Sequence, residues 1–288
     1  MQPISSDLRA WLATQLAAGH TADSLRQSMH EAGWHADAVA AALSESVGDQ
    51  RVVTVTAQTQ TQTPTEMQPA TRMPGPDLDG SPLYIDAGDR QVQVVQTMRH
   101  PRVIVFGNLL ASDECDGLID AARERLARSL TVETRTGGEA VNADRTSEGM
   151  FFERGENPVV ARLEARIARL LRWPVEFGEG LQILRYSPGA QYRPHYDYFD
   201  PTEPGTPTIL RRGGQRLASL VMYLQEPTKG GATTFPDVGL EVAPVRGSGV
   251  FFSYDRPDPA TRSLHGGAPV LEGEKWVATK WLREREFI

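Results

Sequence analysis

The sequence has 288 residues, 40% of them hydrophobic and 23% charged, and its 30 basic and 37 acidic side chains give a net charge of −7 at pH 7. A chain of this length predicts about two domains, and no apolar run approaches the roughly 20 residues that a membrane-spanning helix needs. The acidic balance argues against a nucleic-acid-binding protein.

The chain contains a single cysteine, Cys115, which excludes an internal disulfide and any metal site built from several cysteines. Cys115 lies in an amphipathic stretch, and we interpret it as a buried small apolar residue rather than a nucleophile. The first residues do not show a basic segment followed by an apolar one, so we expect no secretory signal. These features favour a cytoplasmic location.

Residues 1–48 predict three short helices separated by Gly19 and Gly33. The first helix carries leucines at four-residue intervals, and the other two carry apolar residues with helical spacing. This arrangement resembles the small three-helix bundles of the ubiquitin-associated type. We expect the bundle to bind a protein partner and so to raise the effective concentration of that partner.

Residues 49–80 are rich in Thr, Gln and Pro and contain few large apolar side chains. Such a composition cannot bury enough apolar surface to offset the conformational entropy of the chain. We therefore expect a flexible linker, followed by a second domain over residues 81–288.

The second domain begins with helical and extended patterns in alternation. Residues 101–110 predict a strand, residues 112–129 an amphipathic helix capped by Ser112, and residues 157–173 a second helix with one apolar stripe. Beyond these, short β-rich runs alternate with Gly/Pro turns. The fold class predicted from the pattern is α+β, an antiparallel sandwich or barrel with helices packed on one side.

The segment QYRPHYDYFD, residues 191–200, carries the residues of greatest chemical interest. If the segment is extended, His195 and Asp197 point to the same face and can bind one ion. The only histidine downstream is His265. Two imidazoles and one carboxylate form the facial triad of non-haem Fe(II) oxygenases, although a His-x-Asp pair alone is also compatible with a surface histidine beside a turn.

Lys275 lies within an apolar strand pattern, where an unpaired ammonium is costly to bury. An anionic ligand that pairs with it is one explanation, and an edge-strand lysine that reaches water is the other. Tyr186 and Tyr192 precede the His-x-Asp pair, and their hydroxyls could donate to the same anion.

Five stretches of the sequence resemble the 2-oxoglutarate- and Fe(II)-dependent prolyl 4-hydroxylases in order and spacing. Together they extend over about residues 100–284, nearly the whole second domain. They are RTSEGMFF (145–152), LQILRYSPGAQYRPHYDYF (181–199), ASLVMYLQEPTKGGATTFP (218–236), GSGVFFSY (247–254) and HGGAPVLEGEKWVATKWL (265–282).

The resemblance implies a double-stranded β-helix, or jelly-roll, catalytic core with supporting helices. It implies that His195, Asp197 and His265 bind Fe(II), with 2-oxoglutarate and O2 as co-substrates and ascorbate as a further ligand. Lys275 then binds the remote carboxylate of 2-oxoglutarate, with Tyr186 as its hydroxyl partner and Thr279 as a further candidate.

The resemblance also implies that a proline-containing protein or peptide is hydroxylated while 2-oxoglutarate is decarboxylated to succinate. Arg145, Tyr192 and Trp281 are the candidate substrate residues. Ordinary structural roles remain open at this point, a salt bridge for Arg145 and core packing for Trp281. The polar loops 135–147 and 200–216 could close over a peptide.

Two alternatives also remain open. The same chemistry could act on another protein residue or on a small molecule, because one sequence does not show the substrate pocket. A binding protein could also have kept the fold and lost turnover, although the complete set of ligand residues with Lys275 argues against it.

Overall fold

The computed structural model describes residue 26 and residues 73–132, 139–141 and 145–288. The chain divides into two units, residues 1–66 and 67–288, and the following account concerns the second. The predicted three-helix bundle and most of the predicted linker lie outside the described residues, apart from residue 26.

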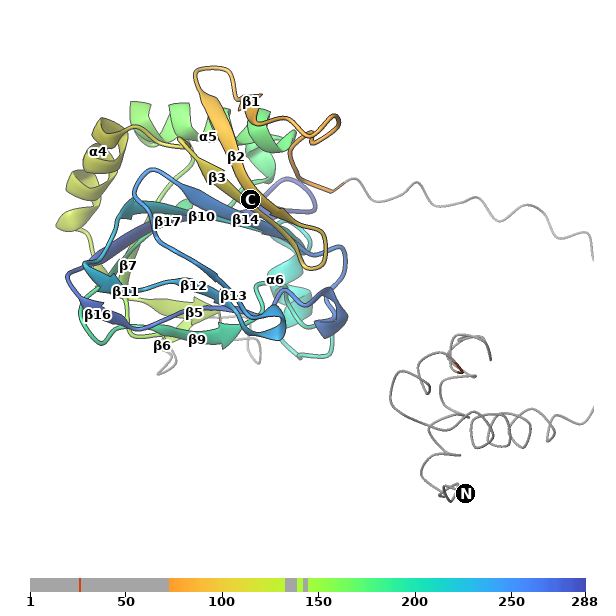
Figure 1. Cartoon of the computed structure of the whole chain (residues 1–288). Helices are drawn as coiled ribbons and strands as arrows, with labels where there is room; N and C mark the ends of the chain where they lie inside the picture. Colours follow the sequence, from red (N-terminus) through yellow and green to blue (C-terminus); the bar gives the residue numbers. More distant parts are fainter. Residues whose placement is uncertain (1–25, 27–72, 133–138, 142–144) are drawn as a thin grey trace, which may run out of the picture. The chain divides into compact units, whose positions relative to one another are not determined.

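Two antiparallel sheets face each other in the described domain (Figure 1). The large sheet has nine strands, which are, in spatial order, β1 (Tyr84–Asp86), β2 (Gln91–Met98), β3 (Arg102–Gly107), β14 (Gly249–Ser253), β10 (Arg216–Gln225), β17 (Lys275–Arg283), β8 (Leu181–Tyr186), β7 (Glu148–Phe152) and β4 (Ala127–Arg128).

The small sheet has four strands, which are, in spatial order, β13 (Leu240–Val242), β12 (Thr233–Phe235), β15 (His265–Gly267) and β9 (Tyr192–His195). Two further pairs complete the β-structure, β11 (Lys229–Gly230) with β16 (Val270–Glu272) and β5 (Leu130–Val132) with β6 (Glu139–Val141). This mostly β core is consistent with the jelly-roll fold, so the predicted antiparallel sandwich is confirmed at this level.

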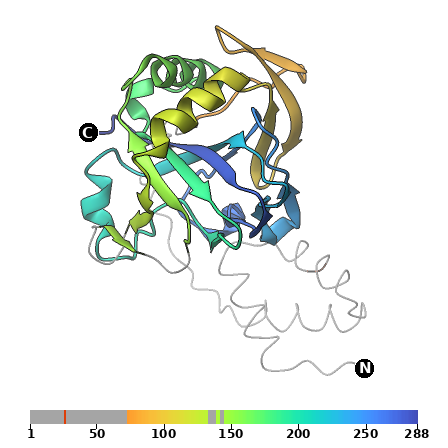
Figure 2. The same cartoon turned by 90° about the vertical axis from the view of Figure 1, so that its left-hand side faces the viewer.

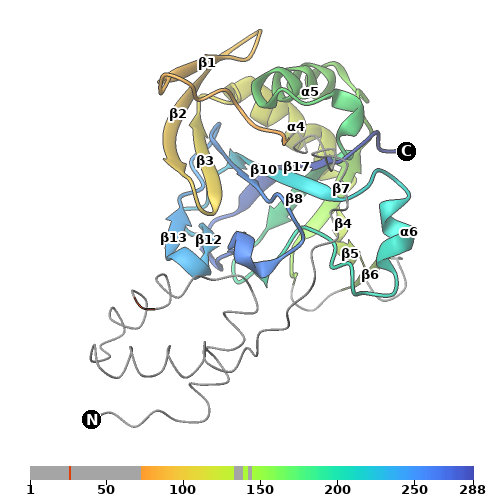
Figure 3. The same cartoon turned by 90° about the vertical axis from the view of Figure 1, so that its right-hand side faces the viewer.

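Two helices, α4 (Ser112–Arg123) and α5 (Pro158–Leu171), lie side by side across the outer face of the large sheet (Figures 2 and 3). The prediction of helices on one side of the sheet is therefore confirmed. Asn157 caps α5, because its side chain accepts hydrogen bonds from the backbone N–H groups of Val159 and Val160.

The predicted cap of the first helix is wrong. Ser112 is the first residue of α4, and the capping position is occupied by Ala111. The Glu114 carboxylate accepts the Ala111 backbone N–H at 2.9 Å, so a charged side chain inside the first turn replaces the cap. The helix also ends at Arg123, before the predicted residue 129, since the chain enters β4 at Ala127.

The strands of the large sheet divide their side chains between two cores. In β17, Trp276 and Ala278 face the helices and belong to the outer core, whereas Val277 faces the small sheet and belongs to the inner core. This alternation follows from the two-residue period of a strand. Lys275 and Thr279 share the inward face with Val277, which places them between the two sheets.

The domain begins earlier than the sequence predicts. Residues 73–80, expected in the linker, include Met73 and Leu78, which pack against the outer core. The backbone N–H of Gly75 also donates to the carbonyl of Leu171 at 2.8 Å. The sequence pattern also missed the hairpin of β1 and β2. None of the described helices is long and apolar enough to cross a membrane.

The loop 200–216 contains structure that its polar composition does not predict. A short helix, α6 (Thr206–Leu210), occupies its centre, and the Thr206 hydroxyl donates to the carbonyl of Asp200 at 2.6 Å. Most of the other predicted loop, 135–147, lies outside the described residues.

A buried ionic cluster joins the two helices to the turn between β1 and β2. Arg166 on α5 is almost fully buried and binds Glu114 on α4 and Asp89 in the turn, with Nη2–oxygen distances of 2.7 and 2.6 Å. Arg162 Nε donates to Glu114 Oε1 at 3.0 Å. Burial opposes ionisation of Glu114, but Arg166 and the other donors outweigh it and lower its pKa to about 2.

We expect Glu114→Gln to lower the free energy of unfolding by about 3 kcal/mol, because it removes the more deeply buried of the two carboxylates that pair with buried Arg166. A carboxyl with a depressed pKa stabilises the fold fully above its unfolded pKa, and this contribution is lost as pH falls through the folded value. The difference between wild type and variant should therefore shrink between pH 4.5 and about 2. Urea unfolding across this range measures it.

The matched control is Glu272→Gln, which breaks an exposed ion pair with Lys229. We expect a change of about 0–1 kcal/mol for this surface pair. Equal losses in the two variants would contradict the stabilising role of the buried cluster.

Candidate functional site

A cavity opens between the two sheets, and most of the residues singled out in the sequence line it. It is lined by Arg145, Leu184, Tyr186, Tyr192, His195, Asp197, Val221, Thr233, His265, Gly266, Gly267, Lys275, Val277, Thr279 and Trp281. All nine predicted site residues are therefore brought together, although they come from four strands and two connecting segments.

His195 and His265 become neighbours because β9 and β15 pair with these two residues directly opposite each other. Their ring centroids lie 4.4 Å apart. The glycine after His265 allows this close approach: a Cβ at Gly266 would lie 2.9 Å from the carbonyl oxygen of Tyr192 and 3.1 Å from the nitrogen of Pro194.

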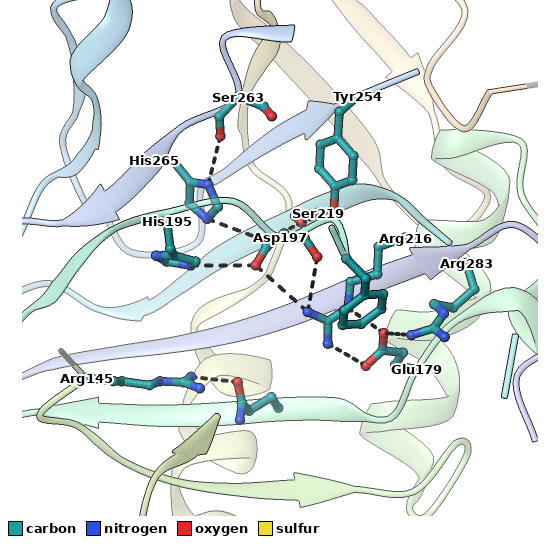
Figure 4. Close-up of polar contacts among 12 residues, drawn as sticks. Arg145, Glu179, His195, Asp197, Arg216, Ser219, Tyr254, Ser263, His265 and Arg283 are labelled. Atoms are coloured by element: carbon teal, nitrogen blue, oxygen red, sulfur yellow. Dashed lines mark hydrogen bonds and ion pairs between the residues drawn. The ribbon is translucent and has the colours of Figure 1, made fainter. Parts of the chain in front are cut away.

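Asp197 completes the group, but from a different position than predicted. β9 ends at His195, so Asp197 lies in the turn beyond the strand rather than on it. Its Oδ1 is 3.6 Å from His195 Nε2 and its Oδ2 is 3.4 Å from His265 Nε2. The three ligand atoms all lie within 4.8 Å of one another, as Figure 4 illustrates.

Backbone carbonyls orient the two imidazoles. His195 Nδ1 is 2.9 Å from the carbonyl oxygen of Arg193, and His265 Nδ1 is 3.0 Å from that of Ser263. A carbonyl only accepts, so each Nδ1 carries a proton and each Nε2 faces Asp197. Metal-binding histidines are commonly oriented in this way.

The charges at the site are those that a cation-binding group requires. Burial by itself would raise the pKa of Asp197, but His265, His195 and Arg216 outweigh it and hold the pKa well below its usual range. Burial and the neighbouring His195 lower the pKa of His265 to about 4. At neutral pH the site therefore presents one carboxylate and a neutral His265, the states in which these groups bind metals.

These residues fit a divalent transition metal. Two imidazole nitrogens and one carboxylate oxygen on one side of an ion leave positions open on the other side, which is the donor set of non-haem Fe(II) oxygenases. The geometry also gives a reason for a cation here, because Asp197 is a buried carboxylate that the Nε2 atoms of both imidazoles face.

A second layer of buried polar side chains surrounds Asp197. The Ser219 hydroxyl donates to Asp197 Oδ2 at 2.5 Å, and the Tyr254 hydroxyl lies 3.1 Å from Ser219 Oγ. On the other side, Arg216 Nη1 is 4.0 Å from Asp197 Oδ1. Glu179 holds Arg216 through two contacts of 2.6 and 2.9 Å.

Sequence analysis missed Glu179, Arg216, Ser219 and Tyr254. For two of them the signal is polar character in a strand that otherwise appears apolar: Arg216 begins β10 and Ser219 interrupts its apolar run, RLASLVMYL. That signal shows that these side chains need partners, but not which ones. Glu179 and Tyr254 lie outside the strands and give no such signal.

Lys275 is 3% exposed, so it does not reach water as an edge-strand lysine would. Its Nζ donates to the carbonyl of Gly231 at 2.8 Å and lies 4.6 Å from the centre of the Tyr186 ring. Burial lowers its pKa to about 8. A buried ammonium that lines the cavity beside neutral partners is suited to an anionic ligand.

Tyr186 and Thr279 line the same cavity as Lys275. Tyr186 lies directly opposite Lys275 in the pairing of β8 with β17, and it presents its ring to the ammonium. Thr279 is buried four residues further along β17, on the same face as Lys275.

The three predicted substrate residues also line the cavity. Tyr192 stacks on His195 with a ring centroid distance of 3.6 Å, and the Arg145 guanidinium lies 5.0 Å from the Tyr192 ring. Arg145 Nη2 also donates to Gln182 Oε1 at 2.7 Å. Trp281 packs on the Arg216 guanidinium at 4.1 Å, and its buried Nε1–H has no acceptor among the described residues.

A family model described as the 2OG-Fe(II) oxygenase superfamily matches residues 181–283, the part of the chain that carries His195, Asp197, His265 and Lys275. Proteins of this superfamily use Fe(II), 2-oxoglutarate and O2.

Curated relatives extend the similarity over about two thirds of the chain. Prolyl 4-hydroxylase 5 of Arabidopsis thaliana is 39% identical over 221 residues, which cover 69% of this chain and 74% of the relative. Prolyl 4-hydroxylase 1 of the same plant is 41% identical over 204 residues, covering 64% and 70%.

A solved structure, the viral collagen prolyl hydroxylase of Paramecium Bursaria Chlorella virus-1, is 30% identical with a TM-score of 0.48 and covers 63% of this chain and 95% of that chain. The identity to the plant enzymes over about three quarters of their length decides the assignment. The chain therefore belongs to the prolyl 4-hydroxylase family within the 2OG-Fe(II) oxygenase superfamily, and it is a 2-oxoglutarate-dependent dioxygenase.

Proposed function

We propose that the chain hydroxylates proline within a peptide or protein, at carbon 4 of the ring, with His195, Asp197 and His265 as the ligands of Fe(II). The observation that carries this proposal is the convergence of these three side chains with buried Lys275 on one cavity. The names of the relatives support the choice of proline as the residue modified.

When Fe(II) and 2-oxoglutarate are bound, they supply oxygen activation coupled to decarboxylation of 2-oxoglutarate to succinate. The tasks of the protein are to bind, to orient and to exclude water. Asp197 and the two imidazoles fix the position of the metal. The neutral inner core beside them, which includes Val277 and Phe252, keeps bulk water from this end of the cavity.

Lys275 binds the remote carboxylate of 2-oxoglutarate in this proposal. A charge-assisted hydrogen bond of this kind is about twice as strong as a neutral one. The carboxylate also supplies a counter-charge to a buried ammonium that otherwise donates to the backbone carbonyl of Gly231, which reduces the free-energy cost of burying it. In this proposal Tyr186, directly opposite Lys275, is the hydroxyl partner of that carboxylate, and Thr279, four residues further along the same face of β17, is a further candidate.

Arg145, Tyr192 and Trp281 contact the peptide substrate in this proposal. The buried indole N–H of Trp281 is available to a substrate carbonyl, since no described residue accepts it. The Arg145 guanidinium and the Tyr192 ring form a stacked wall above His195. The loops 135–147 and 200–216 would then enclose the peptide beside this wall.

We further propose a cytoplasmic location, ascorbate as a reductant, and a protein-binding role for a ubiquitin-associated-like bundle at residues 1–48, joined by a linker to the dioxygenase domain, which includes residues 73–80. The single buried cysteine supports a reducing compartment, where disulfides are rare. The composition of the linker supports two parts that function separately.

The proposed function is tested by incubating the full chain with Fe(II), 2-oxoglutarate and a panel of proline-containing peptides, followed by mass spectrometry. We expect the mass of one oxygen atom to be added to proline, together with succinate. The matched control peptide replaces that proline with alanine. Modification of another residue, or succinate release with no modified peptide in the panel, would contradict proline as the target.

A further inference from the structure

The carboxylate of Asp197 lies at the end of a buried hydrogen-bond chain that starts in a distant segment of the sequence. Ser219 on β10 and Tyr254, just after β14, are both almost fully buried, and neither belongs to the group His195, Asp197 and His265. Strand pairing brings them together, because β10 and β14 are neighbours in the large sheet. Figure 4 shows the chain running from Tyr254 through Ser219 to Asp197.

Which group donates in each of these two hydrogen bonds follows from the number of protons that each side chain carries. A serine hydroxyl has one proton. The ionised Asp197 can only accept, so the Ser219 hydroxyl donates its one hydrogen bond to Asp197 Oδ2, at 2.5 Å. In the 3.1 Å contact between Ser219 Oγ and Tyr254, the phenol must then be the donor. Burial, together with the nearby Asp197 charge, raises the pKa of Tyr254 well above its usual range, so the phenol keeps its proton.

The hydrogen bond from Ser219 restricts how the Asp197 carboxylate can rotate. In the observed orientation Oδ1 faces His195 Nε2 and Oδ2 faces His265 Nε2. Rotation about the Cβ–Cγ bond would break the Ser219 contact and turn the carboxylate plane away from the imidazoles. Arg216, at 4.0 Å from Oδ1, contributes charge on the other side but no short hydrogen bond to the carboxylate oxygens.

We propose that Ser219, supported by Tyr254, is a positioning residue that orients Asp197 for metal binding. The inference rests on the proposed function, since it presumes that Asp197 is a metal ligand. It adds a role for two residues that touch neither metal nor substrate. Partners of this kind commonly change metal affinity by roughly 10- to 100-fold when they are removed.

The test is the affinity of the full chain for Co(II), a redox-stable probe of an Fe(II) site, measured by calorimetry without 2-oxoglutarate. We expect Ser219→Ala to weaken binding about tenfold or more, and Ser219→Thr, which keeps the hydroxyl, to restore it. We expect a smaller loss for Tyr254→Phe, which keeps the ring and removes only the donor.

The double variant gives the sharpest result. If Tyr254 acts only through Ser219, then Tyr254→Phe should change nothing further in the Ser219→Ala background. The control is Tyr223→Phe, which removes another buried phenol donor, to Thr233, without touching Asp197 or its hydrogen-bond chain. We expect wild-type affinity from this control.

Two failures are distinguishable. If the wild type binds Co(II) no better than Asp197→Ala does, the proposed metal site itself is wrong. If the wild type binds Co(II) and folded Ser219→Ala binds it equally well, the metal site stands and the positioning role is overturned. Should Ser219→Ala fail to fold, Tyr254→Phe decides the matter, because unchanged affinity there also contradicts the inference.

Discussion

Replacing His265 by Ala is expected to abolish metal binding and turnover, and His195→Ala is expected to do the same. Each substitution removes one of three ligands and leaves two donors that cannot hold a divalent ion against water. A bound metal supplies several kcal/mol of catalytic stabilisation, and each 1.36 kcal/mol is a factor of ten in rate. The loss in succinate release should therefore be roughly 10³-fold or greater.

Two measurements test this prediction: metal binding by equilibrium dialysis, and the rate of succinate release. His100→Ala is the matched control, since His100 is the other histidine in the described part of the chain and lies exposed between β2 and β3. We expect wild-type behaviour from it. A His265→Ala protein that retains full activity would show that this imidazole is not a ligand.

The second large effect is expected from Lys275→Met, which preserves length and removes the ammonium. A hydrogen bond to a charged group is worth about 1.5–3 kcal/mol, so 2-oxoglutarate binding should weaken roughly 10- to 100-fold. Binding of the metal alone should not change, because Lys275 contacts none of the three proposed ligands. Calorimetric titration of the metal-loaded protein with 2-oxoglutarate tests the first expectation, and titration of the metal-free protein with the metal tests the second.

The pH dependence separates an electrostatic role from a purely structural one. Burial lowers the pKa of Lys275 from 10.5 to about 8, so the free site loses its positive charge as pH rises through about 8. The affinity of the wild type for 2-oxoglutarate should fall above that pH, and this fall should be absent in Lys275→Met.

Lys229→Met is the matched control for this substitution, since Lys229 is an exposed lysine paired with Glu272. It should keep the wild-type affinity and its pH dependence. An unchanged 2-oxoglutarate affinity in Lys275→Met would make Lys275 a structural residue.

The main features of the fold could be predicted because they depend on local patterns. The apolar stripe of the second helix is fully buried in α5, as its spacing indicates, with Val160, Leu163, Ile167 and Leu170 all in the outer core. The boundaries were less predictable. Ser112 looks like a cap, but Glu114 fills that role because Arg166, on another helix, holds its carboxylate in place.

In the candidate site, too, some residues could be predicted from local sequence and others could not. His195, Asp197, His265 and Lys275 could be singled out because their residue types and spacing carry the chemistry. The residues that orient them could not, because their partners are distant in the sequence. Ser219 is 22 residues from Asp197 and 35 from Tyr254, and Arg216 is 37 from Glu179. Only the pairing of strands brings such residues together.

The position of Asp197 shows how a prediction can be correct for an incomplete reason. The two-residue period of a strand places His195 and Asp197 on one face, but the strand ends at His195 and the following turn brings the carboxylate into place. The contacts with Ser219 and Arg216 hold Asp197 there.

The most direct test of the account follows the two atoms of isotopically labelled O2 through one turnover of the full chain with Fe(II), 2-oxoglutarate and a proline-containing peptide. The account predicts one labelled atom in the hydroxyl group of the modified proline and the other in succinate, with both products absent in His195→Ala. Hydroxyproline that takes its oxygen from water, or labelled succinate formed equally well by His195→Ala, would contradict it.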